Sequence, residues 1–64
     1  MIEVNFFLFS EHIATIPMRF RVDKGDTILV NNVLYEVIEA QSLSIKKYND
    51  NCSFEQTVAL KIVF

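Results

Sequence analysis

The side chains that could do covalent chemistry are few, because the 64 residues contain one histidine, His12, and one cysteine, Cys52. A nucleophile needs a base beside it, and a structural zinc ion needs four ligands, of which this pair supplies two. Asp50 lies close to Cys52, and a neighbouring negative charge disfavours the thiolate that a nucleophilic cysteine requires. His12 has only Glu11 as a titratable neighbour in the sequence, so we interpret it as a surface residue. We therefore expect no enzyme activity, no metal site and no cofactor.

Cationic side chains offer a second kind of chemistry, the binding of phosphate or acidic groups. The candidate contacts for an anion or a nucleic acid are Arg19, Arg21, Lys24, Lys46, Lys47 and Tyr48. Tyrosine can stack on a base. The formal net charge of −2 and the pI near 5.1 oppose a nonspecific nucleic-acid binder, which normally carries a basic excess. Two interpretations stay open for these residues, a solvated strand face and an anion-binding surface.

Apolar side chains are more abundant than a small core can use. The composition is 52% hydrophobic with six phenylalanines, whereas a domain of this size buries only about 60% of its unfolded surface. We therefore expect part of the apolar surface to lie in an interface with a second copy or another protein. The candidate interface residues are Phe7, Phe9, Val63 and Phe64. The alternative for Phe7 and Phe9 is that a barrel wall or a loop of the same chain covers them.

The elements that would position these residues are strands, because apolar and polar residues alternate with a period of two. In residues 1–9 the inward side is expected to hold Ile2, Val4, Phe6 and Leu8. Residues 10–14 are expected to form a connection, in which Ser10 could cap a short helical turn. Residues 15–23 are the second expected strand, with Arg19 and Arg21 facing outward and with Ile16, Met18, Phe20 and Val22 facing inward. Pro17 then indicates a sheet edge, because proline has no N–H to donate.

Two turn signals divide the middle of the chain. Gly25, the only glycine, can adopt positive φ without steric cost. Asn31 and Asn32 are the non-glycine residues best suited to a two-residue hairpin turn. The turns separate expected strands at residues 27–30 and 33–40, and the second of these is apolar enough on both faces to be central.

The sequence after residue 40 predicts two more strands, at residues 41–48 and 54–64. A polar loop at residues 49–53 separates them. Val58, Leu60, Ile62 and Phe64 share one side of the last strand. Six strand segments with hardly any helical periodicity predict an all-β fold. We expect a single domain over residues 1–64, built as a small antiparallel barrel or a strongly curled sheet of five to six strands.

The run from Val22 to Val37 combines a Gly-Asp turn, an Asn-Asn hairpin and a returning Tyr35-Glu36-Val37 strand. In this it resembles small Src-homology-type β-barrels. Bacteriophage head–tail adaptor proteins and other small phage modules often carry a similar hairpin. The resemblance covers about a quarter of the chain. It implies a barrel fold and assembly through protein contacts.

These observations favour a small non-catalytic protein–protein interaction module, encoded by a phage or another mobile element. It would act as an assembly adaptor or as an inhibitor of a host protein. A nucleic-acid-binding β-barrel is the alternative, and a small-ligand site in a barrel mouth or between subunits is a third possibility. The sequence shows no secretory signal and no apolar run near the roughly 20 residues that cross a bilayer. We therefore expect a cytoplasmic protein, in the host cytoplasm if it is phage encoded, without a membrane partner.

Overall fold

Six β-strands make up the regular structure of the described part of this protein. The computed structural model describes residues 1–48 and 51–63, apart from the side chains of Tyr48 and Asn51. The strands are β1 (Ile2–Leu8), β2 (Glu11–Met18), β3 (Thr27–Val30), β4 (Val33–Ala40), β5 (Ser44–Tyr48) and β6 (Asn51–Ile62). No helix occurs among the described residues, so the all-β fold class is confirmed.

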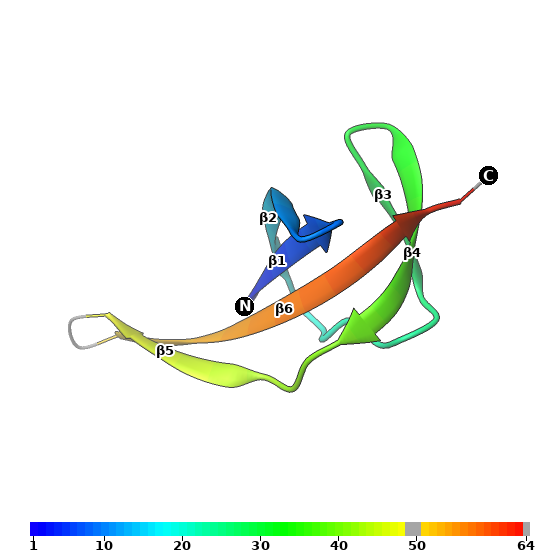
Figure 1. The fold of residues 1–64 in the computed structure, drawn as a ribbon. Coiled ribbons are helices and arrows are strands. Elements are labelled where there is room, and N and C mark those ends of the chain that lie inside the picture. Colours follow the sequence, from blue (N-terminus) through cyan, green and yellow to red (C-terminus); the bar gives the residue numbers. More distant parts are fainter. Residues whose placement is uncertain (49–50, 64) are drawn as a thin grey trace.

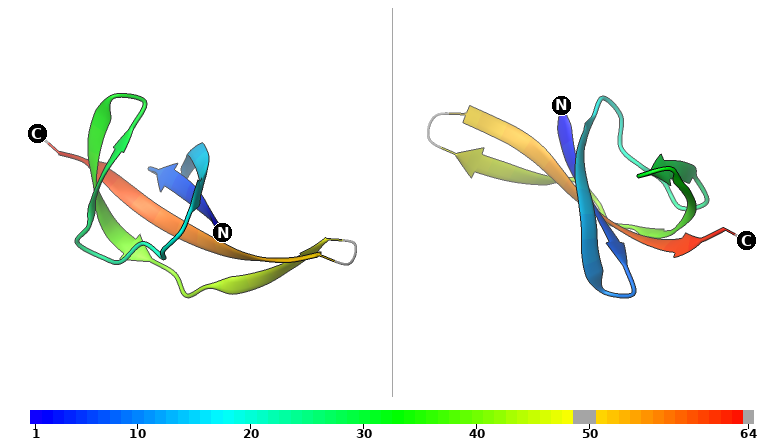
Figure 2. Two further views of the ribbon diagram at one scale, coloured as in Figure 1. Left: turned by 180° about the vertical axis from the view of Figure 1, so that it is seen from behind. Right: turned by 90° about the horizontal axis from the view of Figure 1, so that it is seen from above.

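The strands form one curled sheet in the order β2-β1-β6-β4-β3, with β5 paired to β6 (Figure 1). The long β6 is the centre of this sheet, because it pairs with β1 along one edge and with β4 and β5 along the other. The pairing of β1 with β6 is parallel and the other four pairings are antiparallel. The result is a half-barrel whose edge strands are β2 and β3 (Figure 2).

The expected turn residues stand where the chain reverses. Asn31 and Asn32 have φ of 50° and 66° between β3 and β4, as a two-residue hairpin of type I′ requires. Gly25 has a φ of 94°, and its N–H donates to the carbonyl of Val37 at 2.9 Å. Both sequence predictions are confirmed.

A second two-residue turn corrects the expected connection over residues 10–14. Phe9 and Ser10 have φ of 50° and 67°, Leu8 pairs with Glu11, and β2 begins at once. A bulge at Ile13 then keeps both Ile13 and Ala14 against the core. Positive φ at a bulky residue such as Phe9 is uncommon and costs about 1–2 kcal/mol. No glycine or asparagine marks this turn, so the sequence did not indicate it.

The second strand also ends earlier than expected, at Met18 rather than at residue 23. Residues 19–23 leave the sheet, and Phe20 is 79% exposed instead of facing inward. Arg19 and Arg21 therefore lie on a loop and do not line an outward strand face. Pro17 does lie on an edge strand, as its missing N–H predicted.

The last strand begins earlier than expected, because Asn51, Cys52 and Ser53 belong to β6 rather than to a loop. They pair with Tyr48, Lys47 and Lys46 of β5 and extend the β5–β6 hairpin away from the half-barrel (Figure 1). Side chains of such a projecting hairpin meet solvent, so polar residues do not prevent strand formation there. Residues 49 and 50 of the expected loop, and Phe64 of the expected strand, lie outside the described residues.

The core lies on the concave face and confirms the inward alternation of β1 and β6. Its most deeply buried side chains are Val4, Phe6, Val37, Val58 and Leu60. One polar side chain, Gln56, lies among them with 2% exposure. Its Nε2 donates to the carbonyls of Val22 at 2.6 Å and Gln41 at 3.0 Å, and its Oε1 accepts from the N–H of Val22 at 2.8 Å. Gln56 thus ties the β2–β3 and β4–β5 connections to the centre of the sheet.

Candidate functional site

The curled sheet leaves a hollow between its two edge strands, which we call the seam. It is lined by the end of β2, the β2–β3 loop and the start of β3, and has a volume of about 500 Å³. Its apolar lining comes from Ile16, Met18, Phe20, Val22 and Ile28. The seam exists because residues 19–23 turn across the open end of the half-barrel, where Val22 hydrogen-bonds to Gln56.

The seam combines apolar side chains with strand edges. Each of β2 and β3 pairs with one neighbour among the described residues, so the main chain along its other edge has no strand partner there. Such an edge can add a further strand through N–H and C=O groups. Arg19 and Arg21 also line the seam, and the Arg21 Nε lies 3.3 Å from the Asp23 carboxylate. The arrangement suits an extended peptide with apolar and acidic side chains.

A second apolar surface, the outer patch, comes from the β1–β2 turn, the β3–β4 hairpin and the end of β6. We define it by Phe9, Leu29, Leu34 and Val63, each exposed by 40% or more. Phe9 and Val63 line one hollow with Ile62, Glu36 and Lys61. Val63 donates its N–H to the Leu34 carbonyl at 3.2 Å, and Leu34 pairs with Leu29, which makes the patch continuous.

The four residues predicted as an interface are only partly brought together. Phe9 and Val63 share the hollow of the outer patch. Phe7 is half-buried, and its ring lies edge-on to that of His12 with 5.3 Å between centroids, so part of its cover comes from β2. Phe64 lies outside the described residues. The interface itself stays a prediction.

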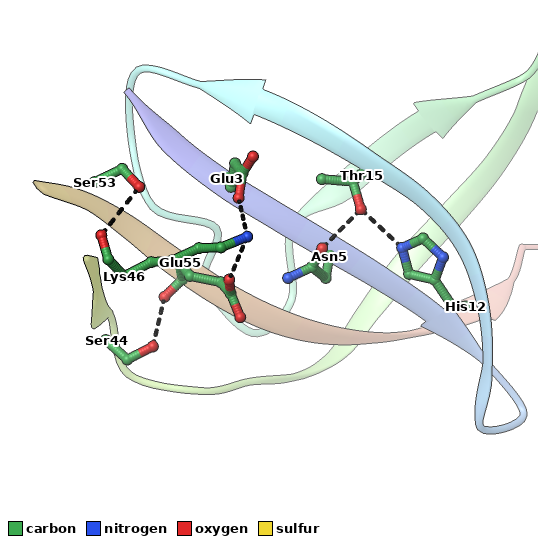
Figure 3. Close-up of polar contacts among 8 residues, drawn as sticks. All are labelled: Glu3, Asn5, His12, Thr15, Ser44, Lys46, Ser53 and Glu55. Atoms are coloured by element: carbon green, nitrogen blue, oxygen red, sulfur yellow. Dashed lines mark hydrogen bonds and ion pairs between the residues drawn. The ribbon is translucent and has the colours of Figure 1, made fainter. Parts of the chain in front are cut away.

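A row of polar side chains crosses the convex face (Figure 3). Thr15 Oγ1 donates to Asn5 Oδ1 at 2.7 Å and lies 2.8 Å from His12 Nε2. Because the only hydroxyl proton of Thr15 is given to Asn5, the His12 nitrogen acts as the donor to Thr15. This direction is opposite to the one in which histidine activates a hydroxyl nucleophile.

The predicted cationic residues come from two separate elements. Arg19, Arg21 and Lys24 lie on the β2–β3 loop, whereas Lys46 and Lys47 lie on β5. Lys46 Nζ lies 3.2 Å from Glu3 and 3.5 Å from Glu55. Two carboxylates thus already surround this ammonium group (Figure 3). The side chain of Tyr48 lies outside the described part of the structure.

The two carboxylate contacts of Lys46 predict that the stability of the fold depends on pH. Hydrogen bonding to Glu3, with the charges of Glu3 and Glu55, raises the pKa of Lys46 above its usual 10.5. A raised pKa in the folded state stabilises the fold below the unfolded pKa, and this contribution is lost as the pH rises through the folded pKa. Lys46→Gln should therefore melt slightly below the wild type at pH 7, and the difference should disappear as the pH rises through the raised pKa of Lys46. Lys47→Gln is the matched control, and a constant difference across pH would contradict the assignment.

Several features of these surfaces were missed in the sequence. The alternation places Phe20 in the core, whereas its side chain is exposed, and it gives no sign that Leu29 and Leu34 share one exposed surface. Gln56 carried a usable signal, because it falls on the inward phase of β6 with Val58 and Leu60. Among the described residues no cluster of three metal-ligating side chains occurs, and Cys52 is exposed. The same residues include no helix that could span a membrane.

Comparison of the chain with protein families, with curated proteins and with solved structures finds no match.

Proposed function

We propose that this protein is a non-catalytic interaction module that binds an extended segment of a partner protein in the seam. The observation that carries the proposal is the open half-barrel, in which two edge strands flank an apolar hollow. A partner strand would supply main-chain hydrogen bonds to one edge and alternate side chains to the hollow. Phe20 would be the main aromatic contact, because it lines the seam and is 79% exposed.

The charges at the seam favour a partner segment with acidic residues. Arg19 forms no ion pair with a described residue, and Arg21 has only the exposed contact to Asp23. Exposed ion pairs of this kind contribute little, so Arg21 can exchange its partner. A guanidinium group binds a carboxylate in two parallel hydrogen bonds, which would fix the register of the bound segment.

Binding of a partner segment in the seam would be sufficient for either of two roles, that of an assembly adaptor or that of an inhibitor. As an assembly adaptor of a phage or another mobile element, it would join larger proteins by capturing a strand from one of them. As an inhibitor in the host cytoplasm, it would occupy a segment that a host protein uses. Both roles require the seam and neither requires a catalytic group.

Selection from a displayed library of peptides of about ten residues tests this proposal. We expect the bound peptides to alternate apolar residues with acidic ones and to bind with micromolar affinity. Phe20→Asn should weaken the best peptide at least tenfold, because it removes the central contact of the seam. Amide chemical shifts should change along β2 and β3.

Phe9→Asn is the matched control, since Phe9 is equally exposed and lies outside the seam. It should leave peptide affinity unchanged. Failure to select any peptide, or equal binding by the Phe20 variant, would overturn the proposal. Salt-dependent binding to single-stranded or duplex oligonucleotides without peptide binding would favour a nucleic-acid-binding barrel instead.

A further inference from the structure

Among the described residues, two tight turns share one backbone geometry but differ in composition. Asn31-Asn32 and Phe9-Ser10 both link antiparallel strands through two residues with positive φ. Asparagine tolerates this conformation because its short side chain can hydrogen-bond locally, whereas phenylalanine has no such compensation. Phe9 therefore occupies a backbone position that suits it poorly.

The side chain of Phe9 gains little from this position. It is 85% exposed, more than any other large apolar side chain of the described residues. Neither backbone preference nor packing within one copy accounts for an aromatic ring at this turn. Residues kept in strained and exposed conformations are found at sites of contact.

The surroundings of Phe9 define what could cover it. Phe9 itself lines one side of a hollow whose other apolar residues are Ile62 and Val63. Glu36 and Lys61 also line that hollow, with their charged groups 3.7 Å apart. One patch thus carries an exposed aromatic side chain, an apolar hollow and one charge of each sign.

We propose that the outer patch binds a second copy of this chain, with Phe9 of each copy entering the hollow beside Val63 of the other. A two-fold interface brings the same surface of both copies together, so it must be self-complementary. The outer patch meets this requirement in shape, because it holds both the projecting ring and the hollow. It also meets it in charge, because Glu36 and Lys61, which form an exposed ion pair at 3.7 Å within one copy, can exchange partners across the two-fold axis.

The expected dimer is weak. A stable interface covers about 800 Å² on each partner, which would be about a sixth of the 4887 Å² surface of this chain. The outer patch has four exposed apolar residues, Phe9, Leu29, Leu34 and Val63, whereas a standard interface has about 20–30 residues on each side. We therefore expect a dissociation constant in the micromolar range. The interface lies apart from the seam, so dimer formation goes beyond the proposed function and leaves peptide binding open.

Light scattering across a dilution series of wild type and Phe9→Asn tests the inference. The wild type should change from dimer to monomer on dilution, and the variant should dissociate at a concentration at least tenfold higher. In dilute, monomeric samples the variant should melt about 4–8 °C above the wild type, because asparagine suits the turn. If Phe9 served only to stabilise the fold of one copy, its replacement would lower the melting temperature. Weaker association together with a higher melting temperature therefore identifies Phe9 as an interface residue.

Two further variants make the test decisive. Phe20→Asn removes an equally exposed ring from the seam and should leave the dimer unchanged. Lys61→Glu should weaken the dimer, and adding Glu36→Lys should restore it, because the two-fold axis pairs the exchanged charges. A wild type that stays monomeric at millimolar concentration, or an unchanged dimer of Phe9→Asn, would overturn the inference.

Discussion

Replacement of Gln56 by leucine is expected to lower the free energy of unfolding by about 3 kcal/mol, although leucine is the more hydrophobic residue. The substitution removes three hydrogen bonds and leaves the N–H and C=O of Val22 without their partner. An unsatisfied buried polar group costs about 1–3 kcal/mol. Since a domain of this size has only about 3–5 kcal/mol in reserve, about 0–2 kcal/mol would remain at 25 °C. Urea unfolding followed by circular dichroism measures the change.

Gln56→Glu separates the loss of hydrogen bonds from the loss of shape. A buried carboxylate cannot donate to the carbonyls of Val22 and Gln41, whereas the protonated acid can donate to one of them. Burial raises the pKa of a carboxyl group, so the stability of this variant should fall as the pH rises through that raised value. The wild type should lack this loss. Equal melting of Gln56→Glu at pH 4 and pH 8 would show that the side chain is not enclosed as described.

Truncation of Leu60 to alanine is the second large expected effect, a loss of about 3 kcal/mol. Leu60 is buried at the centre of β6, where it pairs with Leu8 of β1 and Val37 of β4. Removal of a leucine side chain from such a position costs the transfer of its apolar groups and leaves a cavity, together about 2–5 kcal/mol. The same truncation at Leu29, which is 61% exposed, is the control and should change stability by less than 0.5 kcal/mol. Similar losses at both positions would contradict the placement of the core. Denaturant midpoints of the two variants provide the comparison.

The parts of the fold that the sequence predicted are those in which one face of a strand is buried. Strict alternation identified the inward side of β1, because a one-residue error would expose every core side chain. Turn chemistry identified Gly25 and Asn31-Asn32, where positive φ selects a small set of residues. These signals act locally, so a single sequence contains them.

The errors arose where a local signal was missing or was outweighed by distant contacts. Phe9 and Ser10 form a tight turn without any turn residue, so the start of β2 was misplaced. Phe20 continues the apolar alternation of β2. The hydrogen bonds of Val22 to Gln56 hold the following loop away from the sheet, so β2 ends at Met18, before Phe20. Asn51 to Ser53 look like a loop by composition and are a strand through pairing with β5.

The candidate surfaces could be predicted only in part. The apolar excess predicts an interface that stays a prediction, and two of its four candidate residues, Phe9 and Val63, line one hollow in the structure. The seam could not be foreseen, because it depends on the sheet stopping short of closure between β2 and β3. Strand order is set by contacts between residues far apart in sequence, and no local pattern records it.

The parallel pairing of β1 with β6 also determines when the sheet can be completed during synthesis. Ile2 pairs with Phe54, so one edge of the first strand must wait for the last strand to leave the ribosome. The β1–β2 hairpin can form early, but its free edge then stays open to other nascent chains. Contacts of such long sequence separation also slow folding, because a large loop must close before they form. For this small protein, the period of greatest exposure to misassembly falls before the final strand arrives.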